Sequence, residues 1–181
     1  QALLDYAWNV LMKQAAKNMK DEFGYESIPY GNWKDRKDLT KGWGTFGPEP
    51  RYTTNYYGLR NRLSVLLETY AFAKFDIRVK STYGIIVGIL KQMVADKEKV
   101  TKMIAEADKR AWNRLSGLDP EKDKLYVAWD VTAFDWKIKI KTWEGAEYGR
   151  DANGKRTISP KGERLDLEIP YFGKMVGTTS V

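Results

Sequence analysis

One carboxylate is the first candidate for chemistry, because it ends an apolar run that starts beside two arginines. Within residues 56–70, YYGLRNRLSVLLETY, Arg60, Asn61 and Arg62 precede the apolar run and Glu68 follows it. A carboxylate in a cleft acts as a general base when burial and neighbouring charges tune its pKa. It is structural if Arg60 or Arg62 pairs with it and neutralises a costly buried charge. The residues alone leave both interpretations open.

The flanking side chains also have two interpretations. The arginines are either ion-pair partners or a fork for the terminal carboxylate of a substrate, since a guanidinium matches a carboxylate bidentately. Tyr56, Tyr57 and Tyr70 are either packing aromatics or hydroxyl donors to a developing oxyanion.

The composition excludes several kinds of site within this chain. The 181 residues contain neither histidine nor cysteine, so the chain alone cannot assemble a Ser-His-Asp triad, a zinc site with imidazole ligands or a disulfide. The formal net charge is +7, but acidic and basic residues alternate, so we expect no nucleic-acid partner. No apolar run approaches the roughly 20 residues that span a bilayer, so we expect no membrane partner.

Periodicity predicts the element that positions Glu68. Residues 63–69 are short, branched and apolar on both alternate faces, which predicts a strand buried on both sides of a mainly parallel sheet. Glu68 then lies at the carboxyl end of the strand, where open α/β sheets bind their ligands.

Two helical patterns flank this strand. Apolar residues at three- and four-residue spacing predict a helix over 2–20 that ends at Gly24. The pattern returns at Asp76, a predicted N-cap, and continues to residue 111. We expect either a break near Asp96 or one long helix that projects from the core.

An aromatic stretch and a boundary complete the organisation. Residues 25–55 are rich in Gly, Pro, Trp and Tyr without a period, which is typical of the rim of a site or of an insertion packed by its own aromatics. Gly117, Asp119 and Pro120 mark a boundary, so we predict two parts, 1–117 and 118–181.

Alternating apolar residues predict that the second part is a small antiparallel β module. The expected strands cover 125–131, 136–140 and 164–169, with a turn at 151–154. The Trp-Lys alternation of 136–143 could also bind single-stranded nucleic acid, but the amphipathicity of a sheet explains it better.

Residues 51–70, RYTTNYYGLRNRLSVLLETY, with FDIRV at 75–79, resemble the closing portion of a zinc carboxypeptidase catalytic domain. The likeness is to Bacteroidetes-type members of the carboxypeptidase A-like family. The tail, with EIPYFGK at 168–174 and TTSV at 178–181, resembles the module that follows the catalytic domain in such proteins. The likeness covers most of the chain, and residues 51–79 are its specific part.

The resemblance implies an α/β/α sandwich on a mixed sheet, here partial, and hydrolysis of peptide substrates such as cell-wall peptides. In that family a His-x-x-Glu pair and a later His hold zinc, and a separate Glu on a late strand activates the metal-bound water. That Glu corresponds to Glu68. Arg60, Asn61, Arg62 and Tyr57 are implied substrate-binding residues, although the family's usual Asn-Arg clamp lies earlier in the chain. The family also implies a periplasmic or secreted protein.

The chain departs from the family in lacking the histidine ligands of zinc. It is therefore either the C-terminal fragment of a longer peptidase or a degenerate, non-catalytic relative. The start at Gln1 and the end at Val181 favour the fragment, with the zinc ligands upstream of Gln1 and the missing N-terminal half as a partner. In both cases we expect this chain alone to hydrolyse nothing.

A non-catalytic binding domain is the alternative function. It would use the aromatic stretch 25–55 and the Trp-rich β tail to bind protein or carbohydrate. The two functions differ in what they require of Glu68: an enzyme needs it to line an open cleft, whereas a closed ion pair with Arg62 favours the binding domain.

Overall fold

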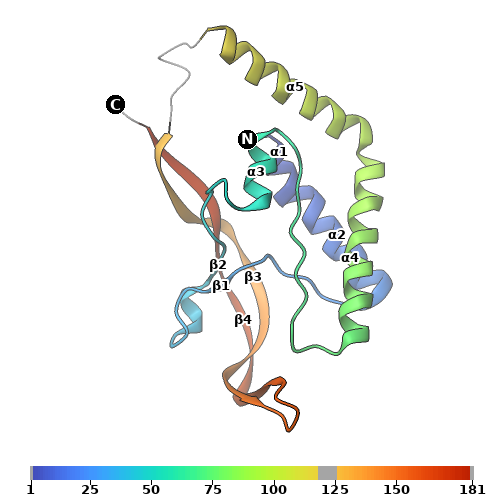
Figure 1. Ribbon diagram of the computed structural model, residues 1–181, viewed down its shortest axis with the longest axis vertical. Helices are drawn as coiled ribbons and strands as arrows, with labels where there is room; N and C mark the ends of the chain where they lie inside the picture. Colours follow the sequence, from blue (N-terminus) through green and yellow to red (C-terminus); the bar gives the residue numbers. More distant parts are fainter. Residues whose placement is uncertain (1, 118–125, 180–181) are drawn as a thin grey trace.

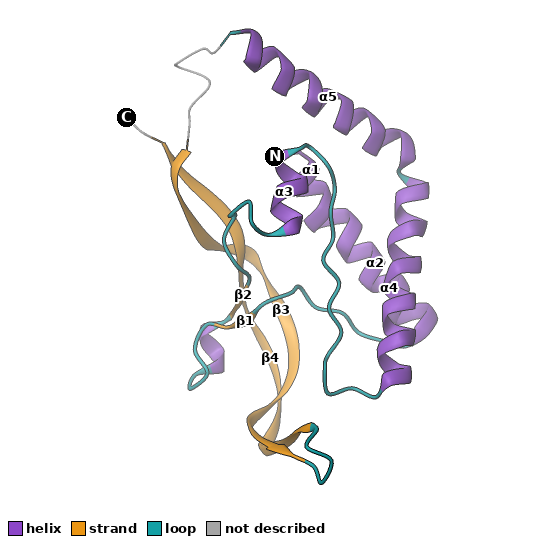
Figure 2. Ribbon diagram, viewed as in Figure 1, coloured by secondary structure: helices purple, strands orange, loops and turns teal. Residues whose placement is uncertain are grey.

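The computed structural model describes residues 2–117 and 126–179. Within these residues the fold is mixed α/β, and Figures 1 and 2 show a helical part beside a long, twisted β-hairpin. The helical part comprises a continuous run over residues 2–23 and the helices α3 (Thr53–Leu59), α4 (Phe75–Ala95) and α5 (Lys97–Ser116). None of the described helices combines the length and the apolar character needed to cross a membrane.

The first helical run confirms the prediction over 2–20 and extends it by three residues. It consists of α1 (Ala2–Tyr6), a π-helical turn η1 (Ala7–Leu11) and α2 (Met12–Phe23). The run ends at Gly24, whose φ of 75° lies in the left-handed region that glycine adopts without strain.

The second helical pattern divides at Asp96, so the predicted break is correct and the single long helix is not. Asp96 accepts hydrogen bonds from Tyr6 (3.0 Å) and Gln92 (2.7 Å), which fix the junction of α4 and α5 against α1. The predicted N-cap was wrong, because Lys74 takes that position without a side-chain hydrogen bond and Asp76 lies in the first turn.

Helices α2 and α4 pack closely because small residues line their contact. A Cβ atom on Gly88 would lie 2.7 Å from the backbone oxygen of Ala15, and one on Gly84 would lie 3.1 Å from Met19. Ala15, Met19 and Ile85 are buried at this contact and form one cluster of the core.

The sheet has the strand order β1-β2-β4-β3. Its strands are β1 (Asn32–Trp33), β2 (Trp43–Gly44), β3 (Tyr126–Arg150) and β4 (Arg156–Thr179). The pair β3·β4 is the long antiparallel hairpin, and β2 adds to β4 in the parallel direction. The three short strands predicted after residue 125 are therefore parts of two long ones, and the predicted turn at 151–154 joins them.

Alternation along the hairpin follows the prediction. Ile138, Ile140, Ile169 and Tyr171 are buried on one face, whereas the lysines that alternate with the β3 isoleucines, Lys137, Lys139 and Lys141, are exposed on the other. Trp8 of η1 packs against this buried cluster and so joins the helical part to the sheet.

The predicted strand over 63–69 was wrong. Among the described residues no strand pairs with this segment, which runs extended from the end of α3 to the start of α4 (Figure 1). Leu63, Val65 and Leu67 nevertheless pack on the helices. The opposite side is open, since Leu66 is 48% exposed, so the expected burial on both sides is also absent.

The predicted division at residue 117 stays a prediction. Asp119, Pro120 and Leu125, on which it partly depended, lie outside the described residues, as do Ser180 and Val181 of the tail motif. The sheet takes β1 and β2 from the first predicted part and β3 and β4 from the second.

We predict that Gly88→Ala lowers the free energy of unfolding by about 1–2 kcal/mol, measured by urea denaturation. The clash with the Ala15 backbone costs more than the roughly 1 kcal/mol that alanine gains over glycine within a helix. Gly58→Ala in α3 is the matched control, because no atom lies within 4 Å of its Cβ position, and we expect it to be stabilising. Equal stabilisation by both substitutions would contradict the close α2–α4 contact.

Candidate functional site

Glu68 is exposed near the C-terminal end of the extended segment 63–69, close to Tyr30. Burial raises the pKa of Tyr30 above its usual value, and the negative charge of Glu68 and hydrogen bonding to it raise that pKa further. The carboxylate is therefore open to solvent and has a phenol as a close neighbour.

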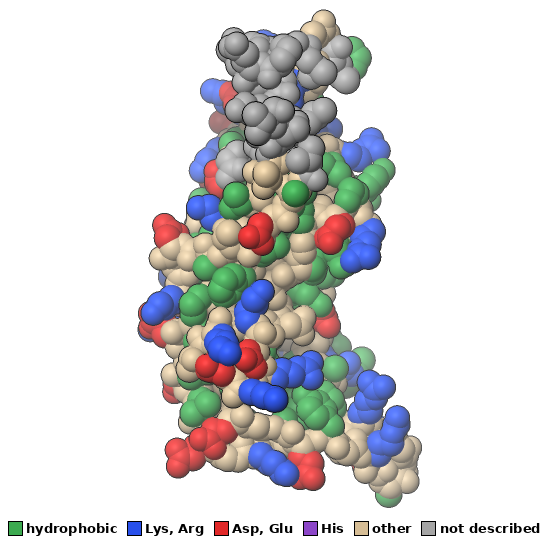
Figure 3. All heavy atoms as spheres, turned by 90° about the vertical axis from the view of Figure 1, so that its left-hand side faces the viewer, with side chains coloured by type: hydrophobic (Ala, Val, Ile, Leu, Met, Phe, Trp, Pro, Cys, Tyr) green, Lys and Arg blue, Asp and Glu red, His purple; other side chains and the backbone are tan. Residues whose placement is uncertain are grey.

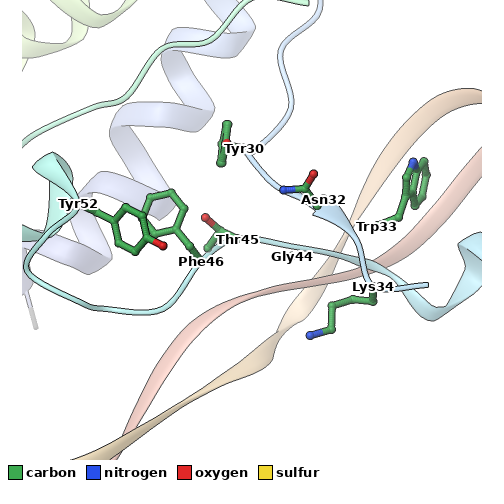
Figure 4. A pocket seen from close by; sticks show the side chains of 8 residues that line it. All are labelled: Tyr30, Asn32, Trp33, Lys34, Gly44, Thr45, Phe46 and Tyr52. Carbon is green, nitrogen blue, oxygen red and sulfur yellow. The ribbon is translucent and has the colours of Figure 1, made fainter. Parts of the chain in front are cut away.

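Tyr30 also lines a surface hollow of about 430 Å³ (Figure 4). Tyr30, Phe46 and Tyr52 form its aromatic wall, with ring centroids 5.9 Å apart for Tyr30 and Phe46 and 4.1 Å apart for Phe46 and Tyr52. The remaining lining residues are Asn32, Trp33, Lys34, Gly44 and Thr45.

The polar groups of the hollow come from the short strands. Asn32 and Lys34 lie at β1, and Thr45 follows β2. The Lys34 ammonium lies 5.0 Å from the centre of the Phe172 ring, a cation–π contact that orients it. The hollow thus combines ring faces with an amide, a hydroxyl and one positive charge.

Hydrogen bonds from outside the hollow hold its walls. The Tyr171 hydroxyl donates to the Tyr30 carbonyl oxygen at 3.1 Å, and the Trp43 indole donates to the Pro29 carbonyl oxygen at 2.9 Å. The Asn55 amide donates to the Gly47 carbonyl oxygen at 2.9 Å, which shapes the loop that carries Phe46 and Tyr52. Buried strands and a helix therefore position this irregular stretch.

The arginine cluster occupies the other end of the extended segment. Arg62 Nη1 lies 3.0 Å from both carboxylate oxygens of Asp108 in α5, and the Asn61 amide donates to the same carboxylate at 3.1 Å. These bonds hold the pKa of Asp108 below its usual range. Asn61 has a φ of 54°, a left-handed turn that asparagine tolerates better than most residues.

Arg60 and the neighbouring tyrosines form a separate exposed group. Arg60 Nη1 donates to the Tyr56 hydroxyl at 3.2 Å, and the rings of Tyr56 and Tyr57 meet edge-on at 5.6 Å. Tyr56 and Tyr57 are each nearly half exposed. Arg60 thus has a neutral partner and keeps its charge.

The structure does not bring the predicted site residues together. An extended chain from residue 62 to residue 68 spans roughly 20 Å, and Figure 1 shows this segment running straight. No ion pair among the described residues joins Glu68 to Arg60 or Arg62. Neither outcome set out from the sequence is therefore observed: Glu68 is not paired with Arg62, and it is exposed to solvent without lining either of the two hollows found among the described residues.

The described residues do not provide a metal site. No group of three or more carboxylate, histidine or cysteine side chains among them could hold an ion, and the whole sequence lacks histidine and cysteine. Zinc, as the resemblance implies it, does not fit the residues of this chain.

Sequence reasoning missed the proximity of Glu68 to Tyr30 and the polar lining of the hollow. The dense glycines and aromatics of 25–55 predicted a rim or an insertion packed by its own aromatics. The ring contacts of Phe46 with Tyr30 and Tyr52 agree with the packed insertion, and the rim of a site stays a prediction. Nothing in the local sequence indicates that Tyr30 meets Glu68, because that contact depends on how two segments cross in space.

Charged side chains of both signs are interspersed on the hairpin side of the molecule (Figure 3), as the mixed charge pattern predicts. Comparisons with protein-family models, with curated proteins and with solved structures gave no match for this chain.

We predict that Glu68→Gln lowers the pKa of Tyr30 but leaves it raised above its usual value, since the substitution removes the charge but keeps the burial. A pH titration of the Tyr30 ring carbon by NMR measures this change. Glu49→Gln, an exposed carboxylate on the loop between Phe46 and Tyr52, is the matched control and leaves the pKa unchanged. An unaltered Tyr30 titration in Glu68→Gln would show that the two side chains do not interact.

Proposed function

We propose that this chain is part of a zinc-carboxypeptidase-like enzyme that hydrolyses peptide bonds, with Glu68 as the general base. The observation that carries the proposal is the exposed Glu68 carboxylate next to Tyr30, a residue that lines a hollow with aromatic walls and a lysine. The likeness of residues 51–79 to that family supports the same assignment.

Glu68 is suited to proton transfer because solvent and substrate can reach it. A general base must lie within hydrogen-bond reach of the proton that it takes, which a closed ion pair would prevent. The hollow that its neighbour Tyr30 lines would accept a side chain of the substrate, with ring faces for apolar groups and Lys34 for a carboxylate.

The zinc ligands in this proposal come from outside the 181 residues, since the described residues do not fit the metal. The complete catalytic domain is then the α/β/α sandwich of the family, of which this chain supplies helices, the extended segment and a β module. The parent enzyme acts on peptides in the periplasm or as a secreted protein.

The proposed substrate contacts of the arginine cluster need a different geometry from the one observed. Arg62 is already occupied by Asp108, whereas Arg60 keeps a free charge. The roughly 20 Å between the cluster and Glu68 exceeds the span of one or two peptide residues, so one terminal residue cannot reach both. Lys34, which lines the hollow, is the cation proposed for a substrate carboxylate.

The decisive experiment uses the protein translated from the complete reading frame, loaded with zinc. We expect Glu68→Gln to lower kcat for peptides with a free C-terminus by roughly 10²–10⁴, the usual contribution of a general base, with little change in KM. Glu49→Gln removes an equal charge near the hollow and should retain activity.

Retention of full kcat by Glu68→Gln would refute the proposed role. The 181-residue chain alone should release no C-terminal residue with or without added zinc. Zinc-dependent release at stoichiometric activity by that chain would contradict the claim that the metal site lies elsewhere.

A binding module for protein or carbohydrate is the second candidate, favoured by the same hollow. Aromatic rings with an amide and a hydroxyl suit the apolar face and hydroxyl groups of a sugar as well as a peptide side chain. This function needs no catalytic role for Glu68.

We predict that a ligand found on a glycan or peptide array binds through this hollow. Tyr52→Ala should weaken its binding at least tenfold by calorimetry, because that substitution removes part of the aromatic wall. Tyr83→Ala in α4 replaces a tyrosine that is 61% exposed outside the hollow and serves as the control. Equal losses in both variants would exclude the hollow as the binding site.

A further inference from the structure

The hollow that Tyr30 lines carries a positive charge without a carboxylate in its own lining. The lining contains one lysine, Lys34, and neither aspartate nor glutamate. Among the described residues no ion pair involves Lys34, whereas its neighbour Lys41 pairs with Asp35 at 2.8 Å. The Lys34 ammonium is therefore available to an anion from outside the chain.

Two contacts hold the Lys34 side chain at the hollow. Its ammonium lies 5.0 Å from the centre of the Phe172 ring. A Cβ atom on Gly44 would lie 3.2 Å from Lys34 Cδ, so the aliphatic stem lies close over the backbone of β2. A side chain that is already ordered loses less conformational entropy when it binds a ligand. This arrangement favours a specific contact over a diffuse attraction.

A second cation acts on the hollow through the hydroxyl of Tyr52. Arg51 Nη2 donates to that hydroxyl at 3.0 Å, and the guanidinium carbon lies 4.9 Å from the centre of the Tyr52 ring. Because the hydroxyl oxygen accepts this bond, its own hydrogen can be donated to an oxygen of a ligand. Both charged side chains near the hollow thus favour a ligand that is rich in acceptors.

Apolar and charged groups occupy different sides of the hollow. Figure 4 shows the rings of Phe46 and Tyr52 on one side and Lys34 on the other, with an amide and a hydroxyl side chain between them. A matching ligand presents an apolar face, then hydroxyl groups, and then a carboxylate. A pyranose ring that carries a carboxylate has these groups in this order. The volume of about 430 Å³ lies within the usual range for small-molecule sites.

The surroundings favour this ligand over an acidic peptide. Glu68 lies beside Tyr30, and its negative charge opposes a carboxylate at that end, which leaves the Lys34 end for the anion. An extended peptide would pair along the edge of the sheet, but the edge strand β1 has only two residues. A glutamate side chain also lacks the hydroxyl groups that Asn32 and Thr45 could bind.

We propose that the hollow binds an acidic sugar, a pyranose that carries a carboxylate. The apolar face of the sugar lies against the aromatic wall, its hydroxyl groups bind Asn32 and Thr45, and its carboxylate binds Lys34. This inference rests on the binding role proposed for the hollow and needs no catalysis by Glu68.

Calorimetry with the 181-residue chain tests the proposal. The probes are trisaccharides of galacturonate, glucuronate and mannuronate, each as the free acid and as the methyl ester, which keeps the ring and removes the charge. We expect at least one acid to bind roughly tenfold or more tightly than its ester, with a preference that decreases as salt is added. Triglutamate, an acidic peptide, should bind more weakly than that acid.

Three results would overturn the acidic sugar as the ligand. They are equal binding of every acid and its ester, binding of triglutamate that is as tight as that of the best acid, and no binding of any acid.

A pair of variants tests the role of Lys34. Lys34→Gln should abolish the preference for the acid and leave the binding of the ester unchanged, because the exposed ammonium acts on the carboxylate alone. Lys37→Gln is the matched control and keeps the preference, since Lys37 is exposed in the same loop but does not line the hollow. A preference that survives in Lys34→Gln, or is lost in Lys37→Gln, would refute the contact with Lys34.

The failure of this inference differs from the failure of either proposed function. Binding of neutral sugars that Tyr52→Ala weakens, without a preference for acids, would refute the acidic sugar and leave the binding role of the hollow intact. Full kcat in Glu68→Gln would refute the peptidase and leave the acidic-sugar site in place.

Discussion

The positions of Arg62 and Glu68 depend on how the extended segment 63–69 packs against the helices. Leu63 and Val65 join the cluster around Tyr6, Leu11 and Val100, and Leu67 joins the cluster at the α2–α4 contact. Fully burying such a side chain is worth about 1.5–3 kcal/mol, and these partly buried ones contribute less each. Their contacts hold the segment without any strand beside it, so Arg62 is directed toward α5 and Glu68 toward Tyr30.

Tyr30 connects this segment to the sheet. Its side chain lines the hollow and meets Glu68, while its carbonyl oxygen accepts the hydrogen bond of Tyr171. Tyr171 is fully buried, and its ring packs with Trp8, Phe134 and Trp136. The hairpin therefore fixes the hollow from one side and the helical part fixes it from the other.

Local sequence patterns were sufficient to predict the helices, the end of the first helical run and the alternation of the hairpin. The spacing of apolar residues found both helical patterns, Gly24 marked a real end, and the alternation around Ile138 and Ile140 identified the hairpin. The strand over 63–69 failed because a strand needs partners that no local pattern reports. Of its two alternate faces, which were both expected to be buried, only the one with Leu63, Val65 and Leu67 packs on the helices. Asp76 failed as a cap because the N-cap is Lys74, two residues earlier, which places Asp76 in the first turn of the helix.

The candidate site was also predictable only in part, because contacts between segments that are distant in the sequence leave no local pattern. Glu68 was singled out from its position after an apolar run, and the structure leaves it open rather than paired with an arginine. Its neighbour Tyr30 is 38 positions earlier in the chain and belongs to a stretch without periodicity. Arg62 found its carboxylate in Asp108, a helical residue that no local spacing connects with it.

The most direct test of the central claim is the sequence of the reading frame immediately upstream of the Gln1 codon. If Glu68 serves a zinc peptidase, that region encodes a His-x-x-Glu pair and, closer to Gln1, another histidine. A start codon directly before Gln1, or an upstream region in which those ligands are replaced, would contradict the peptidase and leave the binding module as the function of the hollow.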